Sequence, residues 1–285
     1  MTAAGGPAAY VDLHMHSTAS DGSRAPAEVI RAAARARLAA IALTDHDTVA
    51  GLPEAQQAGE QLGVRVIPGV ELSAVEGDTE THLLGLHLRD TSVLVRALAG
   101  LREMRERRAR RIVEQLDSIG VHITMDAVLA QAADGAVGRP HVARALIAEG
   151  WAVDSRDAFD RYLAAGRPAY VPKEQLGMRD AIGMIHEAGG LSVLAHPAAS
   201  GTRERLSALR AQGLDGVEVK HPSHSAADTS RLASLARELD LVPSGGSDWH
   251  GASEGPRTIG MMQVPSEWLT LQEERLVAVG RAPAA

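Results

Sequence analysis

The stretch Asp12-Leu13-His14-Met15-His16 brings two histidines one residue apart close to the start of the chain. If this stretch is a strand, alternate side chains share a face, because successive residues of a strand point to opposite sides of the sheet. One face then carries Tyr10, Asp12, His14 and His16, and the other carries Val11, Leu13 and Met15. The first face can coordinate a metal ion, and the second is apolar.

Further along the chain, other apolar runs typical of strands also end in residues that can coordinate a metal. The run Leu38–Leu43 precedes Thr44-Asp45-His46-Asp47, and the run Val64–Val70 precedes Glu71. A fourth run, over residues 80–86, carries His82. Stretches that favour helix, at about 26–37 and 53–62, separate the first three runs.

The alternation of helix and strand returns after about residue 179. Apolar runs at 191–195, 216–220 and 241–246 end in His196-Pro197, His221-Pro222-Ser223-His224 and Ser247-Asp248-Trp249-His250. Between the two alternating parts, residues 100–175 form helical stretches without a strand, beginning with a long arginine-rich helix. We therefore predict a helical insertion over 100–175 within a domain formed by 1–99 and 176–285.

About seven strand-then-helix units predict an α/β fold with a parallel sheet closed into a barrel. In such a barrel the loops that follow the strands meet at one mouth, where the active site lies. We expect the polar residues at the strand ends to gather there. These residues are His14, His16, Asp45, His46, Glu71, His82, His196, His221, His224, Asp248 and His250.

Composition excludes several other classes of protein. The chain has 285 residues, a formal net charge of −7 and no cysteine. The negative charge argues against a broad nucleic-acid surface, and the lack of cysteine excludes disulfides and thiolate metal sites. The N-terminus does not resemble a secretory signal and no stretch is long and apolar enough to span a bilayer, so we predict a cytoplasmic protein without membrane contact.

Imidazoles and carboxylates without thiolates favour Zn²⁺, Mn²⁺ or Fe²⁺. The strand ends offer more ligands than one ion needs, and a glutamate such as Glu71 can bridge two ions. Two or three neighbouring ions can activate water and neutralise a phosphoryl group. The residues thus predict phosphoester hydrolysis by metal-activated water, with two to three divalent ions as cofactors.

Taken together, His14-Met15-His16, Asp21-Gly22, Thr44-Asp45-His46-Asp47, Gly69-Val70-Glu71, His82, His196-Pro197 and Asp248-Trp249-His250 resemble the motifs of the PHP (polymerase and histidinol phosphatase) family. The resemblance implies a distorted (β/α)7 barrel with a trinuclear centre. It assigns His14, His16, Glu71 and Asp248 to one ion. It assigns Glu71, His82 and His196 to a second, and Asp21, His46 and His250 to a third. Some relatives have histidine at the position of Asp21, which leaves the third ion open.

The insertion contains Gly138-Arg139-Pro140-His141-Val142-Ala143-Arg144 and the stretch from Ala165 to Lys173. These resemble the PHP branch that removes the 3′-phosphate of nucleoside 3′,5′-bisphosphates, whose members are also described as 5′→3′ exoribonucleases on short RNA ends. The resemblance implies that the insertion lies over the barrel mouth and binds a small nucleotide. Arg139, His141 and Lys173 are then candidate phosphate contacts.

Several roles and activities stay open at this point. His221 or His224 could contact the substrate or donate a proton to the leaving hydroxyl, and Asp248 and Glu71 are the other candidate catalytic residues. The alternatives to the bisphosphate phosphatase are an exoribonuclease, a histidinol-phosphatase-like enzyme, and a metal-binding module without turnover. Nothing in the sequence indicates a stable protein partner.

Overall fold

The computed structural model describes residues 10–77, 79–132, 137–172 and 176–281. Contacts divide the chain into two compact units. Unit 1 comprises Met1–Val95 and Leu176–Ala285, and unit 2 comprises Arg96–Gln175. The division falls four residues before the predicted start of the insertion, because helix α3 (Thr91–Ser118) begins in unit 1, where Leu94 is fully buried, and continues into unit 2.

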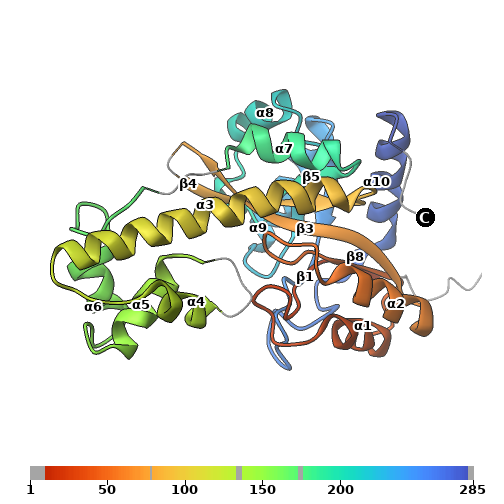
Figure 1. Cartoon of the computed structure of the whole chain (residues 1–285). Coiled ribbons are helices and arrows are strands. Elements are labelled where there is room, and N and C mark those ends of the chain that lie inside the picture. The colour runs from red at the N-terminus through yellow and green to blue at the C-terminus, as the bar shows by residue number, and fades with distance from the viewer. Residues whose placement is uncertain (1–9, 78, 133–136, 173–175, 282–285) are drawn as a thin grey trace, which may run out of the picture. The chain divides into compact units, whose positions relative to one another are not determined.

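Unit 1 is organised around one sheet, in which the described residues form eight strands in the order β7-β6-β5-β4-β3-β2-β1-β8. Helices follow most of the strands (Figure 1), which confirms the predicted α/β class. The strands are β1 (Tyr10–Met15), β2 (Ala40–Leu43), β3 (Arg65–Glu76), β4 (Thr79–Leu86), β5 (Leu191–Leu194), β6 (Gly216–Lys220), β7 (Val242–Gly245) and β8 (Val264–Pro265).

The prediction of seven parallel strands needs correction. Strand β4 runs antiparallel to both of its neighbours, and the short β8 pairs antiparallel with β1. Strand β3 continues past Glu71 to Glu76 and returns directly as β4, with Gly77 at φ 60° in the connection. A connection this short can only join antiparallel strands, because a parallel pair needs a crossover of a dozen or more residues.

The sheet nearly closes into a barrel where the segment after β7 meets β1. The main-chain N–H of Asp248 donates to His14 O at 2.9 Å, and that of His16 donates to Trp249 O at 2.9 Å. This approach requires Gly246, because a Cβ at that position would lie 2.4 Å from the Cβ of His14. The closure brings the first and last predicted ligand motifs side by side.

Most helices of unit 1 contact strands of the sheet and bury apolar residues. Helix α1 has Pro26 at its first turn, and Glu28 accepts a hydrogen bond from the main-chain N–H of Ala25, which caps the helix start. The apolar face of β1 enters the core through Val11 and Leu13, as predicted. The helices are α1 (Pro26–Arg35), α2 (Leu52–Leu62), α7 (Met178–Glu187), α8 (Arg203–Ala211), α9 (Ala226–Glu238) and α10 (Ser266–Ala278).

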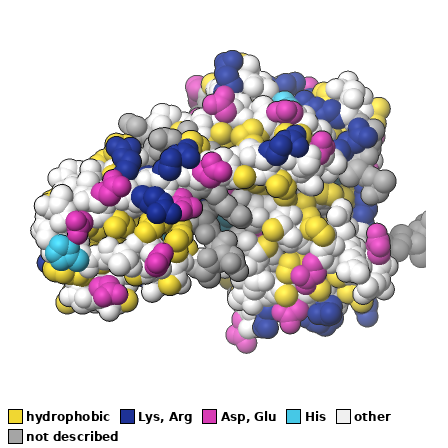
Figure 2. All heavy atoms as spheres, viewed as in Figure 1, with side chains coloured by type: hydrophobic (Ala, Val, Ile, Leu, Met, Phe, Trp, Pro, Cys, Tyr) yellow, Lys and Arg dark blue, Asp and Glu magenta, His cyan; other side chains and the backbone are white. Residues whose placement is uncertain are grey.

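Unit 2 is helical and has its own core, in which Ile112, Leu116, Val128 and Leu146 are buried. The other helices of unit 2 are α4 (Met125–Ala132), α5 (Arg139–Ala148) and α6 (Ser155–Ala158), and a π-helical turn covers Phe159–Leu163. Basic and acidic side chains are interspersed on the face drawn in Figure 2. On α3 the arginines include i,i+4 pairs with glutamates, which favours a solvated helix face over a nucleic-acid contact.

In the described part of the chain, no helix is both long enough and apolar enough to cross a membrane.

Candidate metal centre

Four buried side chains form the first group of potential ligands. His14 comes from β1, His16 directly follows this strand, Glu71 comes from β3, and Asp248 from the loop after β7. Glu71 Oε2 lies 2.9 Å from His14 Nε2 and 3.1 Å from His16 Nε2. Asp248 Oδ1 lies 3.5 Å and 3.2 Å from the same two nitrogens. The structure therefore brings together the four residues predicted for the first ion.

A second group surrounds the other oxygen of Glu71. Its Oε1 lies 2.8 Å from His82 Nδ1 on β4 and 3.1 Å from His196 Nε2 after β5. His46 Nδ1 lies 3.5 Å from Glu71 Oε2. Among the described residues, the ligand atoms of His46, Glu71 and His82 are close enough together to hold one ion, and His196 is not part of that set. One carboxylate thus presents an oxygen to each of two histidine groups, which is the geometry of a bridging ligand.

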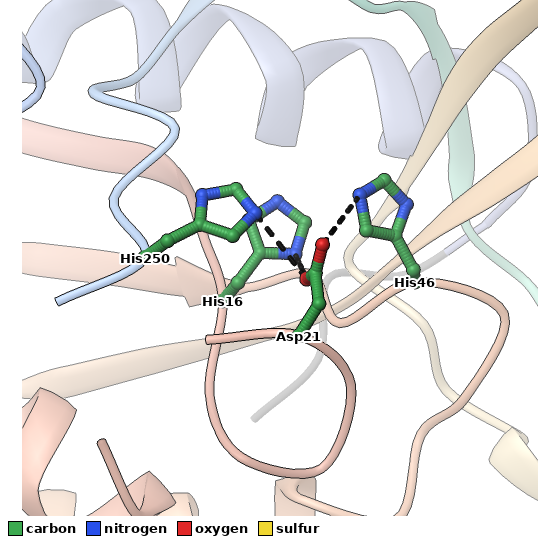
Figure 3. Close-up of side chains that lie close together, drawn as sticks. All are labelled: His16, Asp21, His46 and His250. Atoms are coloured by element: carbon green, nitrogen blue, oxygen red, sulfur yellow. Dashed lines mark ion pairs between the residues drawn. The ribbon is translucent and has the colours of Figure 1, made fainter. Parts of the chain in front are cut away.

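The third group, drawn in Figure 3, consists of His16, Asp21, His46 and His250. Asp21 Oδ1 lies 3.3 Å from His250 Nε2, and Asp21 Oδ2 lies 3.9 Å from His46 Nε2. The Asp21 side chain is 57% exposed, so this group is the most open of the three. Partial burial raises the pKa of Asp21, but the contacts with His250 and His46 outweigh it and lower the pKa to about 2.

The ring of His16 indicates that these groups suit a metal. Both ring nitrogens are buried and neither has a hydrogen-bond partner in the described residues, although acceptor oxygens lie close by. A buried nitrogen without a partner costs stability. A divalent ion in the first group would satisfy Nε2, which lies beside Glu71 and Asp248, while Nδ1 faces Asp21 at 3.8 Å. A neutral imidazole with carboxylates is a suitable donor set for such an ion.

The histidines and carboxylates of the cluster shift one another's pKa values. Burial raises the pKa of Glu71, but the neighbouring histidines, above all His14, outweigh it and hold the pKa well below its usual range. For His14, burial lowers the pKa, whereas Glu71 and Glu218 raise it well above its usual value. The carboxylate of Glu71 is therefore ionised and ready to bind a cation.

Two aspartates hold the loops that carry the ligands. Asp45 accepts hydrogen bonds from the Ser17 main chain at 2.7 Å and from the Ser20 hydroxyl at 2.8 Å, in the loop that leads to Asp21. Asp12 accepts one from the main-chain N–H of Ser247, next to Asp248, at 2.9 Å. Neither contacts a ligand ring, so each supports the centre through the backbone.

A cavity of about 530 Å³ opens beside the second group, with His82 and His196 in its wall. Arg205 also lines it, and its guanidinium donates to Glu76, Thr81 and Ser200. This volume lies in the range of small-molecule sites in proteins. The second group is therefore accessible to a small molecule from this cavity.

Comparison with known proteins identifies the family. The model of the PHP domain matches residues 12–188. The chain belongs to the PHP family. It is 39% identical over 88% of its length, and 91% of the relative, to a 3′,5′-nucleoside bisphosphate phosphatase of Chromobacterium violaceum. It is 37% identical over 84% of its length, and 89% of the relative, to a 5′-3′ exoribonuclease of Haemophilus influenzae.

A solved structure has the same fold. It comes from a Bifidobacterium adolescentis protein assigned as a metal-dependent phosphoesterase, with 34% identity, a TM-score of 0.73, and coverage of 94% of this chain and 97% of that one. The present protein is accordingly a PHP-type hydrolase of phosphoric esters, and the prediction of an enzyme is confirmed over that of a metal-binding module.

Within this PHP domain both ring nitrogens of His224, a predicted substrate contact or proton donor, contact the main chain. Its Nδ1 is 2.9 Å from Val219 O, and its Nε2 is 3.1 Å from the main-chain N–H of Ala198. The His224 ring therefore links strand β6 to the segment after β5. The roles predicted for His224 in substrate binding and proton transfer stay predictions.

His221 is buried inside the cluster. Its Nε2 lies 3.3 Å from Asp248 Oδ2, and its Nδ1 lies 2.7 Å from Ser223 Oγ. With 2% of its surface exposed, His221 supports Asp248, and this placement does not favour a direct contact with substrate.

The predicted phosphate contacts belong to unit 2. Arg139 at the start of α5 donates to Leu163 O at 3.3 Å and stacks near the rings of Phe159 and Tyr170. His141 Nδ1 accepts from the main-chain N–H of Gly138 at 2.9 Å and so caps α5. Lys173 lies outside the described residues.

Two residues near the ligands were not predicted from the sequence. Glu218 on β6 lies 3.1 Å from His14 Nδ1, and Arg257 donates to Asp248 from the loop after β7. Glu218 could have been noticed as a lone acidic residue in the apolar run Gly216–Val219. Arg257 lies in a polar loop, where the sequence carries no comparable signal.

Proposed function

We propose that this chain hydrolyses the 3′-phosphate of nucleoside 3′,5′-bisphosphates with the help of two to three divalent ions, Mn²⁺, Zn²⁺ or Fe²⁺. The observation that carries the proposal is Glu71, whose two oxygens face different histidine groups at 2.9 Å and 2.8 Å. The relative with bisphosphate phosphatase activity, which this chain matches over 88% of its length, supports the substrate class.

The residues would be divided among the ions as the family resemblance implies. The first ion would bind His14, His16, Glu71 and Asp248, the second Glu71, His82 and His196, and the third Asp21, His46 and His250. When bound, such ions activate water near neutral pH and neutralise charge on a phosphoryl group. We retain Arg139, His141 and Lys173 as candidate contacts for the other phosphate of the substrate.

The chain's own groups organise this reaction. Glu71 and Asp248 remain ionised, because the histidines around them lower the pKa of each carboxyl by more than burial raises it. His221 and Arg257 hold Asp248 Oδ2, which leaves Oδ1 directed at His14 and His16. The carboxylates therefore act as fixed ligands and not as proton carriers.

The test is phosphate release by purified protein reloaded with Mn²⁺. Release of one phosphate from adenosine 3′,5′-bisphosphate, with loss of release in His14→Ala and Asp248→Asn, is the expected result. Full activity in both variants would contradict a role for the metal centre. Faster turnover of histidinol phosphate than of the bisphosphate would instead indicate a histidinol-phosphatase-like enzyme.

The second candidate is a 5′→3′ exoribonuclease that uses the same residues, supported by the match to the Haemophilus influenzae enzyme over 84% of this chain. Conversion of a short 5′-monophosphorylated RNA to single nucleotides would support it. A protein that cleaves the bisphosphate but leaves such an RNA intact would exclude it.

A further inference from the structure

Glu218 is the acidic residue of strand β6, and its side chain is fully buried. Its Oε1 lies 3.1 Å from Nδ1 of His14, and its Oε2 accepts a hydrogen bond of 2.7 Å from the main-chain N–H of His196. These two partners belong to different ligand groups. In the proposed centre His14 would bind the first ion and His196 the second.

We propose that Glu218 is a positioning residue that fixes His14 and His196 together, so that one buried carboxylate sets the geometry of two neighbouring metal positions. The inference rests on the metal centre of the proposed function, and Glu218 lies outside the ligand set assigned there. Glu218 is also grouped with His14 and His221 as a possible ligand, but its hydrogen bond to the His196 main chain is the contact of a positioning residue.

The effect on His14 concerns which ring nitrogen carries the proton. Nε2 of His14 points to Glu71 Oε2 at 2.9 Å, on the side of the proposed ion, and Nδ1 points to Glu218. A carboxylate can only accept, so Glu218 holds the proton on Nδ1 and leaves the lone pair of Nε2 for the metal. Carboxylate partners of this kind also orient the ring and make it more basic.

The effect on His196 concerns the backbone. His196 has φ 29°, in the left-handed region that residues with a side chain seldom adopt. The hydrogen bond from its main-chain N–H to Glu218 holds this conformation, in which Nε2 of His196 lies 3.1 Å from Glu71 Oε1. Without the acceptor, the N–H would be left unpaired beside β6, and the loop would relax and withdraw the ring.

A neutral residue of the same shape cannot serve both partners. Glutamine has one acceptor oxygen, and its NH₂ group is a donor. In Glu218→Gln, the amide can therefore accept from His14 or from the His196 main chain, but not from both. We expect metal affinity to fall by about 10- to 100-fold, the usual effect of removing a residue that orients a metal ligand.

Asp215→Asn is the matched control. Asp215 precedes the same strand, is 5% exposed, and accepts from His186 Nε2 at 2.7 Å and from the Ser192 main chain at 2.9 Å. It thus has the same kind of partners as Glu218 but contacts none of the proposed ligands. A loss of stability without a loss of metal affinity is expected for this variant.

The experiment is a Zn²⁺ titration against a competing chelator, with metal content measured on wild type, Glu218→Gln and Asp215→Asn. A weakened affinity at two positions in Glu218→Gln, with wild-type affinity in Asp215→Asn, is the expected result. Wild-type affinity in a folded Glu218→Gln would overturn the inference while leaving the metal centre intact. A wild-type protein that binds no metal would overturn both.

A second measurement does not depend on the variant folding. In Zn²⁺-loaded wild-type protein with ¹⁵N-labelled histidine, the His14 ring should carry its proton on Nδ1. A proton on Nε2 of His14 would overturn the inference directly.

Discussion

Glu71 shows how one residue decides what this centre can do. Its carboxylate is buried, and its two oxygens contact His14 and His16 on one side and His82 and His196 on the other. The sequence predicted these residues from their places at strand ends. Glu218 and Arg257 were not predicted. Glu218 is a single charged residue in a strand, and nothing near it in the sequence indicates its distant partner His14. Arg257 lies in a loop, and the sequence does not indicate that this loop folds back onto Asp248.

Replacement of the shared carboxylate tests its importance. In Glu71→Gln the amide offers one acceptor to two histidine groups, so both ions should be weakened together. We expect phosphatase activity to fall by more than about 100-fold, beyond the usual effect of a residue that only orients a ligand. Phosphate release and metal content measured on the same sample should fall in parallel, and activity that survives with the metal lost would be inconsistent with this role.

His87 makes stability depend on pH outside the metal centre. Burial lowers its pKa to about 4, and its Nε2 lies 3.1 Å from the Gln272 side chain. In the unfolded chain His87 takes up a proton near pH 6.5, whereas in the folded protein it stays neutral down to about pH 4. The contribution of His87 to the free energy of unfolding is therefore highest above pH 6.5 and decreases as the pH falls towards 4. We expect about 2 kcal/mol less stability at pH 5 than at pH 7.5 from this group.

Urea unfolding of wild type and His87→Gln at both pH values measures this contribution. The difference between the two pH values should be smaller in the variant by the stated amount. An equal pH dependence in both proteins would show that His87 is not responsible.

At the level of elements, the site is built by the approach of β1 to the segment after β7. The sequence predicted these strands and their polar ends, because the apolar runs are short and end in recognisable motifs. It did not predict the direction of β4, since a buried apolar strand reads the same way in a parallel and an antiparallel pairing. The turn at Gly77 is the feature that sets the direction.

The tight approach at Gly246 gives a prediction for these elements. A Cβ there would lie 2.5 Å from the main-chain N of His14, so Gly246→Ala must separate the two segments. We expect a loss of about 1–3 kcal/mol, typical of overpacking, together with loss of metal. Gly183→Ala within α7, where a Cβ meets nothing within 4 Å, is the control. Equal thermal stability of the two variants would argue against the closure described here.

For the whole molecule, the chain combines a barrel-like unit that carries every proposed metal ligand with a helical unit that has a separate core. The alternation of strands and helices is interrupted over 100–175, which predicted an insertion, because a segment without strands cannot form part of the barrel sheet. How this unit contributes to binding could not be derived, because Arg139 and His141 lie in a part of the chain with no metal ligand of its own. The prediction that the insertion covers the barrel mouth stays a prediction.

Substrate kinetics can test the proposed division of labour between the two units. If Arg139 binds the second phosphate, Arg139→Ala should raise KM for the bisphosphate by about 10- to 100-fold, as expected for a lost charged hydrogen bond, without changing metal content. Arg144→Ala on the same helix, where the guanidinium contacts Gln131 O, is the control. Unchanged KM in Arg139→Ala would remove this residue from the proposed substrate site.

The most direct test of a multinuclear PHP centre is the number of metal ions bound per chain. Elemental analysis of the purified protein, equilibrated with Mn²⁺ and then freed of unbound metal, should give two to three ions per wild-type chain. This number is expected because Glu71 presents its two oxygens to separate histidine groups and Asp21, His46 and His250 form a further group. A value of one ion or fewer would contradict it.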